Sequence, residues 1–335
     1  MEIDSSTIIN CEKSLLFKGR PGDPRLGDLV EMPSKANDQG NTKHKIRFSL
    51  YGCPDDLGVT LNRGRSGAKE GPNAIRSFLY KMCPPLKWQS HNHKLVDFGN
   101  IVTQSDILAN HKRAFTVSKH LARDSVVIAL GGGHDYATPN ILGWLSGAME
   151  CHSPPPSKRK KINVGIINVD PHLDVRELEN NLPHSGTPFR QILESGKITG
   201  SNLVQFGARE GRNAKSHFDY CTKNKVRMCL LESILKKSSP ALAFKNELIR
   251  LEKLCTDVAV TIDMDSCSEL EGVSAAPVLG FRAWDLCQFA YLAGQSKKVR
   301  FLEIAEVAPS LDPTGRSARV AAEVIFYFLK GKVSS

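Results

Sequence analysis

The amino-acid sequence predicts an α/β protein: a three-layer α-β-α sandwich around a mainly parallel sheet of about eight strands. Short apolar runs recur from residue 46 onward, and several are continuous instead of alternating with polar residues. Such runs are typical of strands that helices cover on both faces. Segments of helical character separate these runs to the end of the chain, which favours parallel strands joined by helical crossovers.

The expected elements follow in chain order. Strands are predicted at residues 46–51, 95–98, 126–130, 164–169, 203–206, 227–231, 258–262 and 299–304. Helices are predicted at residues 71–80, 106–121, 136–149, 186–194, 241–254, 283–293 and 317–329, the first with Pro72 in its opening turn. Residues 1–44 show weak periodicity and are expected to form an N-terminal arm or extension, so that residues 45–335 make one domain.

The composition is that of a globular protein, and the cysteines and the first residues together predict a cytoplasmic location. Hydrophobic residues make up 41% of the 335 and charged residues 24%, which allows a sizeable core. The nine cysteines are scattered without a CxxC pair, and the first residues lack the apolar segment of a secretory signal. Reduced thiols are therefore expected. No run approaches the roughly 18 apolar residues of a membrane span, so no membrane partner is expected.

The chain is basic, with a net charge of +10, and part of the excess is local. The run Lys158-Arg159-Lys160-Lys161 follows three prolines. It fits a nuclear import signal, but its place between two predicted core elements favours a solvated loop. No aromatic stacking pattern accompanies the positive charge, so no nucleic-acid partner is expected either.

Metal-capable side chains follow three of the predicted strands, in the motifs GGGHD, DPHLD and VTIDMD. They are His134, Asp170, His172, Asp174, Asp263 and Asp265. In parallel sheets ligands bind beyond the carboxyl ends of the strands, so we expect these six to meet at one edge. Each motif alone also fits a structural role: a glycine turn with a satisfied histidine, a polar loop, or a charged strand end. Their conjunction favours a metal site.

Four carboxylates and two imidazoles indicate a centre with two metal ions. Carboxylates packed together repel one another unless cations offset their charge, and two divalent ions neutralise four of them. Oxygen-rich ligands with some imidazole suit Mn²⁺, and zinc or cobalt would also fit chemically. The expected cofactor is thus two Mn²⁺ per chain. Two ions about 3.5–4 Å apart can lower the pKa of a shared water and make hydroxide available near neutral pH.

These motifs resemble those of the ureohydrolase (arginase/agmatinase) superfamily, from about Phe48 to the C-terminus. The likeness also covers the loop NRGRSGA, the following Gly71-Pro72, and EIAEVAP at residues 303–309. The resemblance implies a ureohydrolase-type catalytic domain over residues 45–335 and a division of the six ligands between two Mn²⁺. It further implies a homo-oligomer, either a homotrimer or a homohexamer.

The segment LPHSGTPFRQ at residues 182–191 is most similar to the formimidoylglutamase branch. Arginases and agmatinases tend to carry a histidine where this chain has Ser185. The resemblance implies hydrolysis of N-formimino-L-glutamate to L-glutamate and formamide, in histidine degradation, by attack of a metal-bridging hydroxide. Two alternatives stay open: another ureohydrolase (agmatinase, arginase or guanidino-acid hydrolase), which the missing histidine disfavours, and a catalytically silent regulatory homologue, which the complete ligand set disfavours.

The implied substrate is a small anionic amino acid with two carboxylates, and arginine offers a two-pronged partner to a carboxylate. Arg176 lies two residues beyond Asp174, so we expect its guanidinium to enter the same cleft. Further arginine candidates are Arg63, Arg190 and Arg209. The predicted substrate-binding residues are Asn62, Arg65, Arg176, Ser185 and Gly186.

Two carboxylates are the predicted catalytic residues. Asp174 is expected to take the proton of the attacking hydroxide and pass it to the departing nitrogen. Glu306 is expected to face the cationic formimino group. Two departures from the family pattern lie nearby: Pro171 stands where an alanine is usual, and Cys267 lies in an altered loop, as a spectator or as a redox-sensitive thiol.

Overall fold

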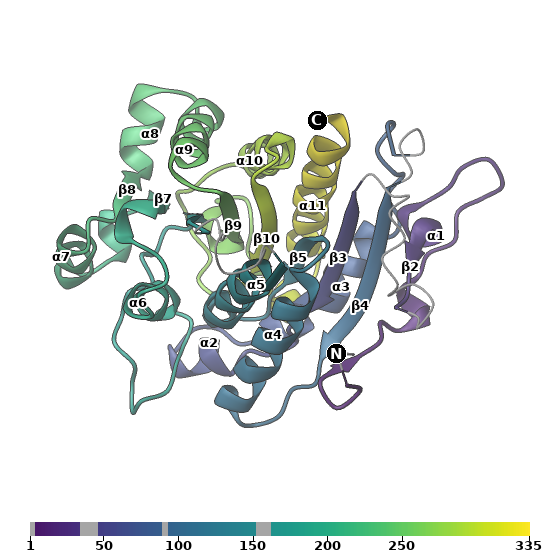
Figure 1. The fold of residues 1–335 in the computed structure, drawn as a ribbon, viewed down its shortest axis with the longest axis horizontal. Helices are drawn as coiled ribbons and strands as arrows, with labels where there is room; N and C mark the ends of the chain where they lie inside the picture. The colour runs from purple at the N-terminus through teal and green to yellow at the C-terminus, as the bar shows by residue number, and fades with distance from the viewer. Residues whose placement is uncertain (1–3, 34–45, 89–92, 152–161) are drawn as a thin grey trace, which may run out of the picture.

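The computed structural model describes residues 4–33, 46–88, 93–151 and 162–335. Over these residues the chain forms a ten-stranded sheet between two layers of helices (Figure 1). The basic run at 158–161 and residues 1–3 and 34–44 of the predicted arm lie outside the described residues. None of the helices within the described ranges is long and apolar enough to cross a membrane.

The strand order is β1-β4-β3-β5-β10-β9-β6-β7-β8, with β2 also paired to β4, and only the β1–β4 pair is antiparallel among the described pairs. The strands are β1 (Ile8–Ile9), β2 (Val30–Glu31), β3 (Arg47–Gly52), β4 (Lys94–Ile101), β5 (Val126–Leu130), β6 (Val164–Val169), β7 (Leu203–Ala208), β8 (Arg227–Leu230), β9 (Asp257–Asp263) and β10 (Val299–Ala305). Every predicted strand is confirmed. The two additional strands, β1 and β2, come from the N-terminal 44 residues and extend the edge of the sheet.

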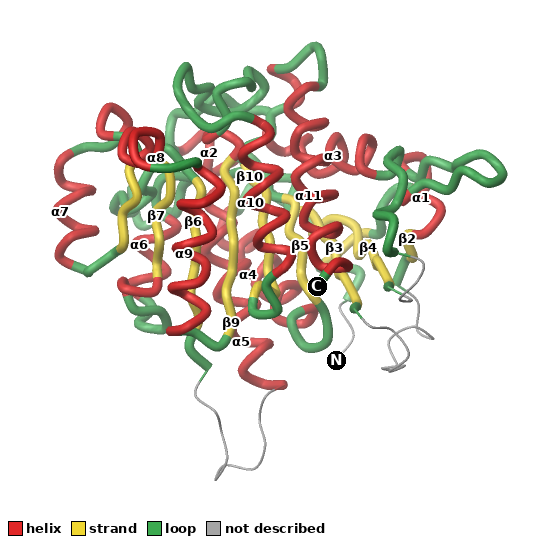
Figure 2. Tube along the Cα trace, turned by 90° about the horizontal axis from the view of Figure 1, so that it is seen from above, coloured by secondary structure: helices red, strands yellow, loops and turns green. Residues whose placement is uncertain are grey.

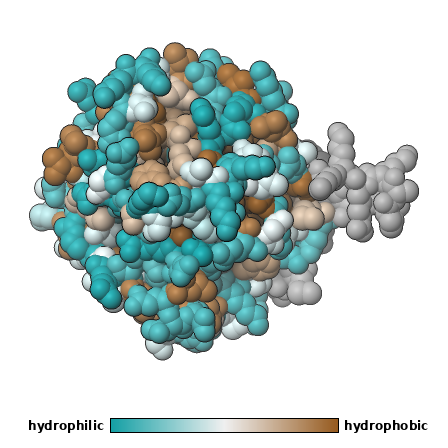
Figure 3. All heavy atoms as spheres, turned by 90° about the vertical axis from the view of Figure 1, so that its left-hand side faces the viewer, coloured by the Kyte–Doolittle hydropathy of each residue, from teal (hydrophilic) through white to brown (hydrophobic). Residues whose placement is uncertain are grey.

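Helices cover both faces of the sheet, as predicted (Figure 2). One layer holds α4 (Ile107–Leu121), α5 (Ala137–Cys151), α6 (Pro188–Glu194) and α7 (Lys215–Lys223). The opposite layer holds α3 (Gly71–Leu79), α8 (Leu231–Lys237), α9 (Pro240–Leu254), α10 (Ala283–Gln295) and α11 (Arg316–Ser334). The short helices α7 and α8 were not predicted, because each buries only one or two side chains and leaves little apolar periodicity. The side of the molecule on which α7 and α8 lie has a largely hydrophilic surface (Figure 3).

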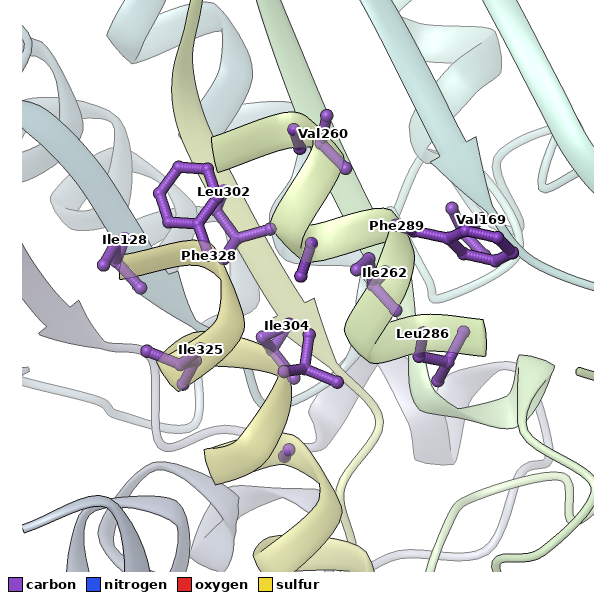
Figure 4. Close-up of a cluster of buried hydrophobic side chains, with 14 of the residues drawn as sticks. Ile128, Val169, Val260, Ile262, Leu286, Phe289, Leu302, Ile304, Ile325 and Phe328 are labelled. Carbon is purple, nitrogen blue, oxygen red and sulfur yellow. The ribbon is translucent and has the colours of Figure 1, made fainter. Parts of the chain in front are cut away.

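The alternation of side chains along each strand builds two separate hydrophobic cores. On β5, Ile128 and Leu130 belong to one core, whereas Val127 and Ala129 belong to the other. The first core includes Leu302 of β10 and Phe328 of α11 in one cluster of buried side chains (Figure 4). Because both faces are covered, the central strands read as continuous apolar runs in the sequence.

The central strands β5, β10, β9 and β6 are neighbours and run in the same direction. Their carboxyl ends therefore lie at one edge of the sheet. Residues that follow positions 130, 169, 263 and 305 are brought together there, although they are far apart in the chain. The topology alone gathers three of the polar motifs and Glu306 in one place.

A fully buried ion pair fastens α3 to the sheet. Arg76 Nε donates to Asp97 Oδ2 at 2.8 Å and Arg76 Nη2 to Asp97 Oδ1 at 3.0 Å, while the Tyr80 hydroxyl also donates to this carboxylate. Both charged side chains are completely buried. Each charge thus depends on the other for compensation.

The variant Arg76→Met is expected to lower the free energy of unfolding by about 3–5 kcal/mol, because it leaves Asp97 buried without a cationic partner. Urea denaturation followed by circular dichroism measures this change. Lys215→Met removes an exposed ion pair with Asp219 and should cost less than about 1 kcal/mol. Equal losses in the two variants would contradict this view of the Arg76 pair.

Candidate metal centre

The six predicted ligands meet at the carboxyl edge of the sheet. Each follows or ends one of three central strands: β5, β6 or β9. They are His134 in the turn after β5, Asp170, His172 and Asp174 in the loop after β6, Asp263 at the end of β9, and Asp265 just beyond it. All except His172 are buried, and the imidazole of His172 is about one quarter exposed, with 24% of its side chain accessible.

Four of these residues form a first group around one point. His134 Nδ1 lies 3.2 Å from Asp170 Oδ2, 3.1 Å from Asp174 Oδ2 and 3.3 Å from Asp263 Oδ2. One ligand atom from each of the four residues lies within 4.8 Å of those of the others. Such convergence of three carboxylate oxygens and one imidazole nitrogen suits a divalent cation.

A second group adjoins the first. His172, Asp263 and Asp265 also present ligand atoms within 4.8 Å of one another. Asp170 reaches this group as well, because its Oδ1 lies 3.2 Å from His172 Nδ1. Asp263 therefore belongs to both groups, and Asp170 contacts both imidazoles. The arrangement fits two neighbouring cations that share two carboxylates.

The protonation equilibria of the protein without ions show how strongly the carboxylates repel one another. Burial and the neighbouring Asp170 raise the pKa of Asp174 to about 7. Burial and neighbouring carboxylates also raise the pKa of Asp263 and, more strongly, that of Asp265. For Asp170 burial acts in the same direction, but hydrogen bonds from His134 and His172 outweigh it and lower the pKa.

The two histidines respond in the opposite sense. Burial disfavours the charged imidazole of His172, yet the carboxylates of Asp170, Asp174 and Asp265 raise its pKa to about 10. The same competition raises the pKa of His134 well above its usual value. In the absence of ions the site thus draws protons into the imidazoles and carboxyls. Two divalent cations would supply this positive charge instead, so the donor set fits them.

Two backbone positions at the site have left-handed conformations that side chains other than glycine rarely adopt. Asp174 has φ 48° and Glu306 has φ 68°. Each costs roughly 1–2 kcal/mol relative to an ordinary conformation. The strain is held in place by hydrogen bonds: Glu306 N donates to the carbonyl of Gly132, and the carbonyl of Asp174 accepts from Phe189 N. Such strain clusters at functional sites.

Glu306 was predicted to be catalytic, and its carboxylate lines the same cavity as the ligands. Its Oε1 accepts a hydrogen bond from His134 N at 2.6 Å. Its Oε2 is buried and has no close hydrogen-bond partner among the described residues, although the neighbouring Ser274 hydroxyl acts to lower the pKa of this carboxyl. Burial, with the charges of Asp263 and Asp265, raises the pKa of Glu306 well above its usual value. This orphaned oxygen is a place for a donor or cation from a ligand.

The cavity above the ligands has a volume of about 390 Å³, and three of the predicted substrate-binding residues, Asn62, Arg176 and Ser185, line it, with Gly186 close to Arg176 and Asn62. Asn62 Nδ2 donates to Ser185 Oγ at 3.0 Å. Gly186 lies beneath the side chain of Arg176, because a Cβ at this position would meet Arg176 Cδ at 2.7 Å and Asn62 Nδ2 at 3.2 Å. Only glycine leaves room for the arginine to lie here. The structure therefore brings Asn62, Ser185, Gly186 and Arg176 together.

Arg65, the fifth predicted substrate contact, also lines the cavity, but its guanidinium is engaged. It donates to the carbonyls of Glu271, Val273 and Ser274 at 2.9, 2.6 and 3.3 Å. The loop that it holds reaches the metal ligands, since Ser274 Oγ donates to Asp265 Oδ2 at 3.2 Å. The geometry thus gives Arg65 a supporting contact with this loop.

The arginines around the cavity differ in whether their charge is already compensated. Arg190 pairs with Glu177 and Glu194, and Arg209 lies near Glu232 and donates to the carbonyl of Leu279. Arg63 is 3.8 Å from Glu179, with both side chains largely exposed. For Arg176 and Arg212 the structure records no acidic partner within the described ranges. These two guanidinium groups are available to an anionic ligand.

The segment after β7 supplies cavity residues that the sequence interpretation did not single out: Gly211, Arg212, Asn213 and His217. Asn213 braces the ligand loop, because its Oδ1 accepts from Leu173 N at 2.8 Å and its Nδ2 donates to the carbonyl of Pro171 at 2.9 Å. Burial and the charge of Arg176 lower the pKa of His217. A signal was present, since REGRN directly follows β7, whose carboxyl end lies at the same edge of the sheet.

The two unusual residues near the site are accommodated locally. Pro171 is used through its carbonyl, which accepts from Arg209 N and Asn213 Nδ2, so the missing N–H is of no consequence there. Cys267 is fully buried, and burial raises the pKa of its thiol to about 11. A protonated, inaccessible thiol favours the spectator role for Cys267.

Comparison with known proteins agrees with this geometry. Residues 46–330 match the model of the arginase family. Formimidoylglutamases of Staphylococcus aureus are 32% identical over 286 residues, which covers 84% of this chain and 85% of theirs. The solved formiminoglutamase of Trypanosoma cruzi with Mn²⁺₂ is 29% identical, with a TM-score of 0.78, over 93% of this chain and 99% of that one.

Two further structures are similar. Formimidoylglutamase from Bacillus subtilis is 25% identical, with a TM-score of 0.80, over 95% of this chain and 94% of that one. Proclavaminate amidino hydrolase from Streptomyces clavuligerus is 23% identical, with a TM-score of 0.70, over 87% of this chain and 92% of that one; this match supports the fold. The predicted three-layer α/β architecture is confirmed by these neighbours.

Asp263→Asn is expected to weaken the binding of both cations, because its carboxylate belongs to both ligand groups. Asp265→Asn changes only one group, so it should affect mainly one cation. Mn²⁺ titration by isothermal calorimetry, with the two equivalents resolved, distinguishes these outcomes. Two unaltered binding events in Asp263→Asn would show that the shared position is misassigned.

The protein without ions is expected to lose stability as pH rises from about 5 to 9. The folded state raises the pKa of Asp174 from 3.8 to about 7 and of His172 from 6.5 to about 10. Both groups thus bind protons more tightly when folded, and their contribution, full at low pH, is lost as each folded-state pKa is passed. Cations compete with these protons, so stabilisation by Mn²⁺ should grow over the same range. Thermal melts at pH 5, 7 and 9, with Mn²⁺ or with a chelator, measure both trends.

Proposed function

Because the chain belongs to the arginase family, we propose that it acts as a metal-dependent formimidoylglutamase that hydrolyses N-formimino-L-glutamate to L-glutamate and formamide, a step of histidine degradation. The observation that carries the proposal is the joint presence of a two-cation ligand set and the uncompensated Arg176 in one cavity. The formimidoylglutamase relatives support this substrate over a guanidine.

Six residues are proposed to hold two Mn²⁺, one ion for each of the two ligand groups described above. His134 and Asp174 would hold one ion and His172 and Asp265 the other, and Asp170 and Asp263 lie close enough to both groups to contribute to either. When bound, the ions supply a water of lowered pKa and positive charge to offset the charge that develops at the formimino carbon. The neighbours of known structure that contain Mn²⁺₂ support the choice of metal.

We assign proton transfer to Asp174. At 8% accessible it is the most exposed of the four aspartate ligands, and its carboxylate lines the cavity. It therefore lies between the ligand group and the substrate space. In the proposed reaction Asp174 accepts a proton from the attacking water and delivers it to the departing nitrogen, so that glutamate leaves as an amine and not as its anion.

Glu306 is proposed to orient the formimino group. The protonated formimino nitrogen carries positive charge and N–H donors, and Glu306 Oε2 is a buried acceptor without a close hydrogen-bond partner in the described chain. A hydrogen bond to a charged group in such a site is worth about 1.5–3 kcal/mol. Because Oε1 is fixed by His134 N, the free oxygen has a defined direction relative to the ligands.

The two carboxylates of the substrate are proposed to pair with Arg176 and Arg212. Both residues line the cavity and have no acidic partner among the described residues, so their charges are available to a dianion. Asn62 and Ser185 line the cavity as well, with Gly186 close to Arg176. Arg65 remains a candidate through its place at the cavity, with its main contribution assigned to the loop at residues 271–274.

The protein is further proposed to work in the cytoplasm as a homo-oligomer, a homotrimer or a homohexamer. Family membership is the support for this assembly. Size-exclusion chromatography with light scattering tests it, and a monomer at micromolar concentration would contradict it.

The first test of the function is a comparison of substrates by the protein loaded with Mn²⁺. Formiminoglutamate should yield glutamate and formamide, whereas arginine and agmatine should yield no urea. Turnover of a guanidine would instead identify another ureohydrolase. Two bound Mn²⁺ without turnover of any of these would point to a substrate outside this set, and absence of both metal and activity would favour the regulatory alternative.

Arg176→Ala and Arg212→Ala are each expected to lower kcat/KM for formiminoglutamate by about 10- to 100-fold, from the loss of a charge-assisted hydrogen-bonded pair. N-formimino-4-aminobutyrate lacks the α-carboxylate, so the variant whose arginine binds that group should lose little on this analogue. Arg123→Ala, which removes a surface pair with Glu150, is the matched control. Steady-state kinetics measures all three, and wild-type values in both cavity variants would exclude these contacts.

A further inference from the structure

A row of polar residues crosses the sheet just below the metal ligands. Cross-strand pairing places its members at one level, and their side chains face the layer of α4 and α5. In sheet order they are Tyr51 on β3, Ala129 on β5, Glu303 on β10, Thr261 on β9, Asn168 on β6 and Gln205 on β7. All are completely buried, and only Ala129 is apolar. Buried polar side chains in otherwise apolar strands need hydrogen-bond partners, because burial removes them from water.

The row begins with a directed chain of hydrogen bonds. The Tyr51 hydroxyl donates to Asn140 Oδ1 at 2.6 Å, which orients the amide of Asn140. Asn140, from α5, then donates through Nδ2 to Glu303 Oε1 at 2.7 Å. The side chain of Asn140 thus links Tyr51 to Glu303 across Ala129, which has no polar group in its side chain. Glu303 Oε1 is in this way fixed as an acceptor.

The chain continues to a metal ligand. Thr261 donates its hydroxyl proton to Glu303 Oε2 at 3.0 Å. The same oxygen, Thr261 Oγ1, lies 3.0 Å from His134 Nε2. A hydroxyl has one proton, so once it is given to the carboxylate the threonine can only accept from the imidazole. His134 must then carry its proton on Nε2.

The other nitrogen of His134 is the one that faces the ligand carboxylates. Nδ1 lies 3.1–3.3 Å from oxygens of Asp170, Asp174 and Asp263. With the proton held on Nε2, a neutral imidazole directs the lone pair of Nδ1 into this group. With the opposite tautomer Nδ1 would carry a proton and could not ligate a cation.

We propose that Thr261 and Glu303 are positioning residues that hold His134 in the Nε2–H tautomer and thereby set the affinity of the cation site to which His134 belongs. Asn140 and Tyr51 anchor Glu303 from the far side and give the chain its direction. The inference rests on the proposed metal centre, and Mn²⁺ titration of the unaltered protein tests that premise separately.

The decisive comparison is between Thr261→Val and Thr261→Ser. Valine keeps the shape of threonine and removes the hydroxyl, whereas serine keeps the hydroxyl. Thr261→Val is expected to weaken binding of one Mn²⁺ by about 10- to 100-fold and leave the other within about threefold, while Thr261→Ser restores both. Calorimetry measures the affinities, and electron paramagnetic resonance at limiting Mn²⁺ distinguishes a coupled pair of ions from a single one.

Controls separate positioning from a general effect on the fold. Thr138→Val removes another buried hydroxyl, one that donates to the carbonyl of Pro188 and forms no hydrogen bond with the ligands in the described chain. It should bind both ions like the unaltered protein. Thermal melts without Mn²⁺ should give similar midpoints for the two valine variants.

Glu303→Gln is the second test if Thr261→Val does not fold. The amide of glutamine has one acceptor oxygen in place of two, so it cannot accept from both Asn140 and Thr261, and the same selective weakening is expected. Unchanged Mn²⁺ binding in a folded Thr261→Val or Glu303→Gln protein would overturn the proposal. So would equal weakening of both ions, or the failure of Thr261→Ser to restore the lost affinity.

Discussion

Five buried carboxylates share one end of this molecule, and the repulsion among them is the constraint on which the site depends. Asp170, Asp174, Asp263, Asp265 and Glu306 lie together, and within the described part of the chain no lysine or arginine forms an ion pair with any of them. Backbone N–H groups offset part of this negative charge. Ala275 N donates a hydrogen bond to Asp265, and His172 N donates one to Asp170. The rest is left to imidazoles and to cations. Positive side chains are kept instead on the cavity wall, where they suit an anionic substrate.

The fold provides this arrangement through strand direction. Parallel strands end at a common edge, and helices on both faces bury the apolar side chains of the sheet. The apolar cores stabilise the sheet, which in turn holds strained positions such as Asp174 and Glu306. The same topology therefore gives a rigid sheet and leaves unsatisfied polar groups at its carboxyl edge. The catalytic proposal needs both, because ligands must be held in place while a carboxylate and two arginines stay free to meet a substrate.

The sequence was sufficient for eight of the ten strands, for the main helices and for the gathering of six metal-capable side chains at one edge of the sheet, because each depends on a local pattern: apolar runs, turn glycines, and polar residues directly after a strand. It was not sufficient where tertiary contacts decide. The engagement of Arg65 with a loop more than 200 residues away, and the freedom of Arg212, depend on which partners the fold brings near. For Thr261 and Asn168 a local signal did exist. Each lies two residues before a ligand, and so on the same face of its strand.

The position of β10 has a consequence for how the centre comes into being. It is the last strand along the chain, yet it lies in the middle of the sheet between β5 and β9. Until it inserts, the strands that carry His134 and Asp263 have no common neighbour, and Glu303 and Glu306 are absent. During synthesis the early part of the chain therefore cannot complete the ligand set. The six candidate ligands are all present only in a chain that extends past Asp265, and in the folded sheet β10 then separates the strand before His134 from the strand that ends at Asp263.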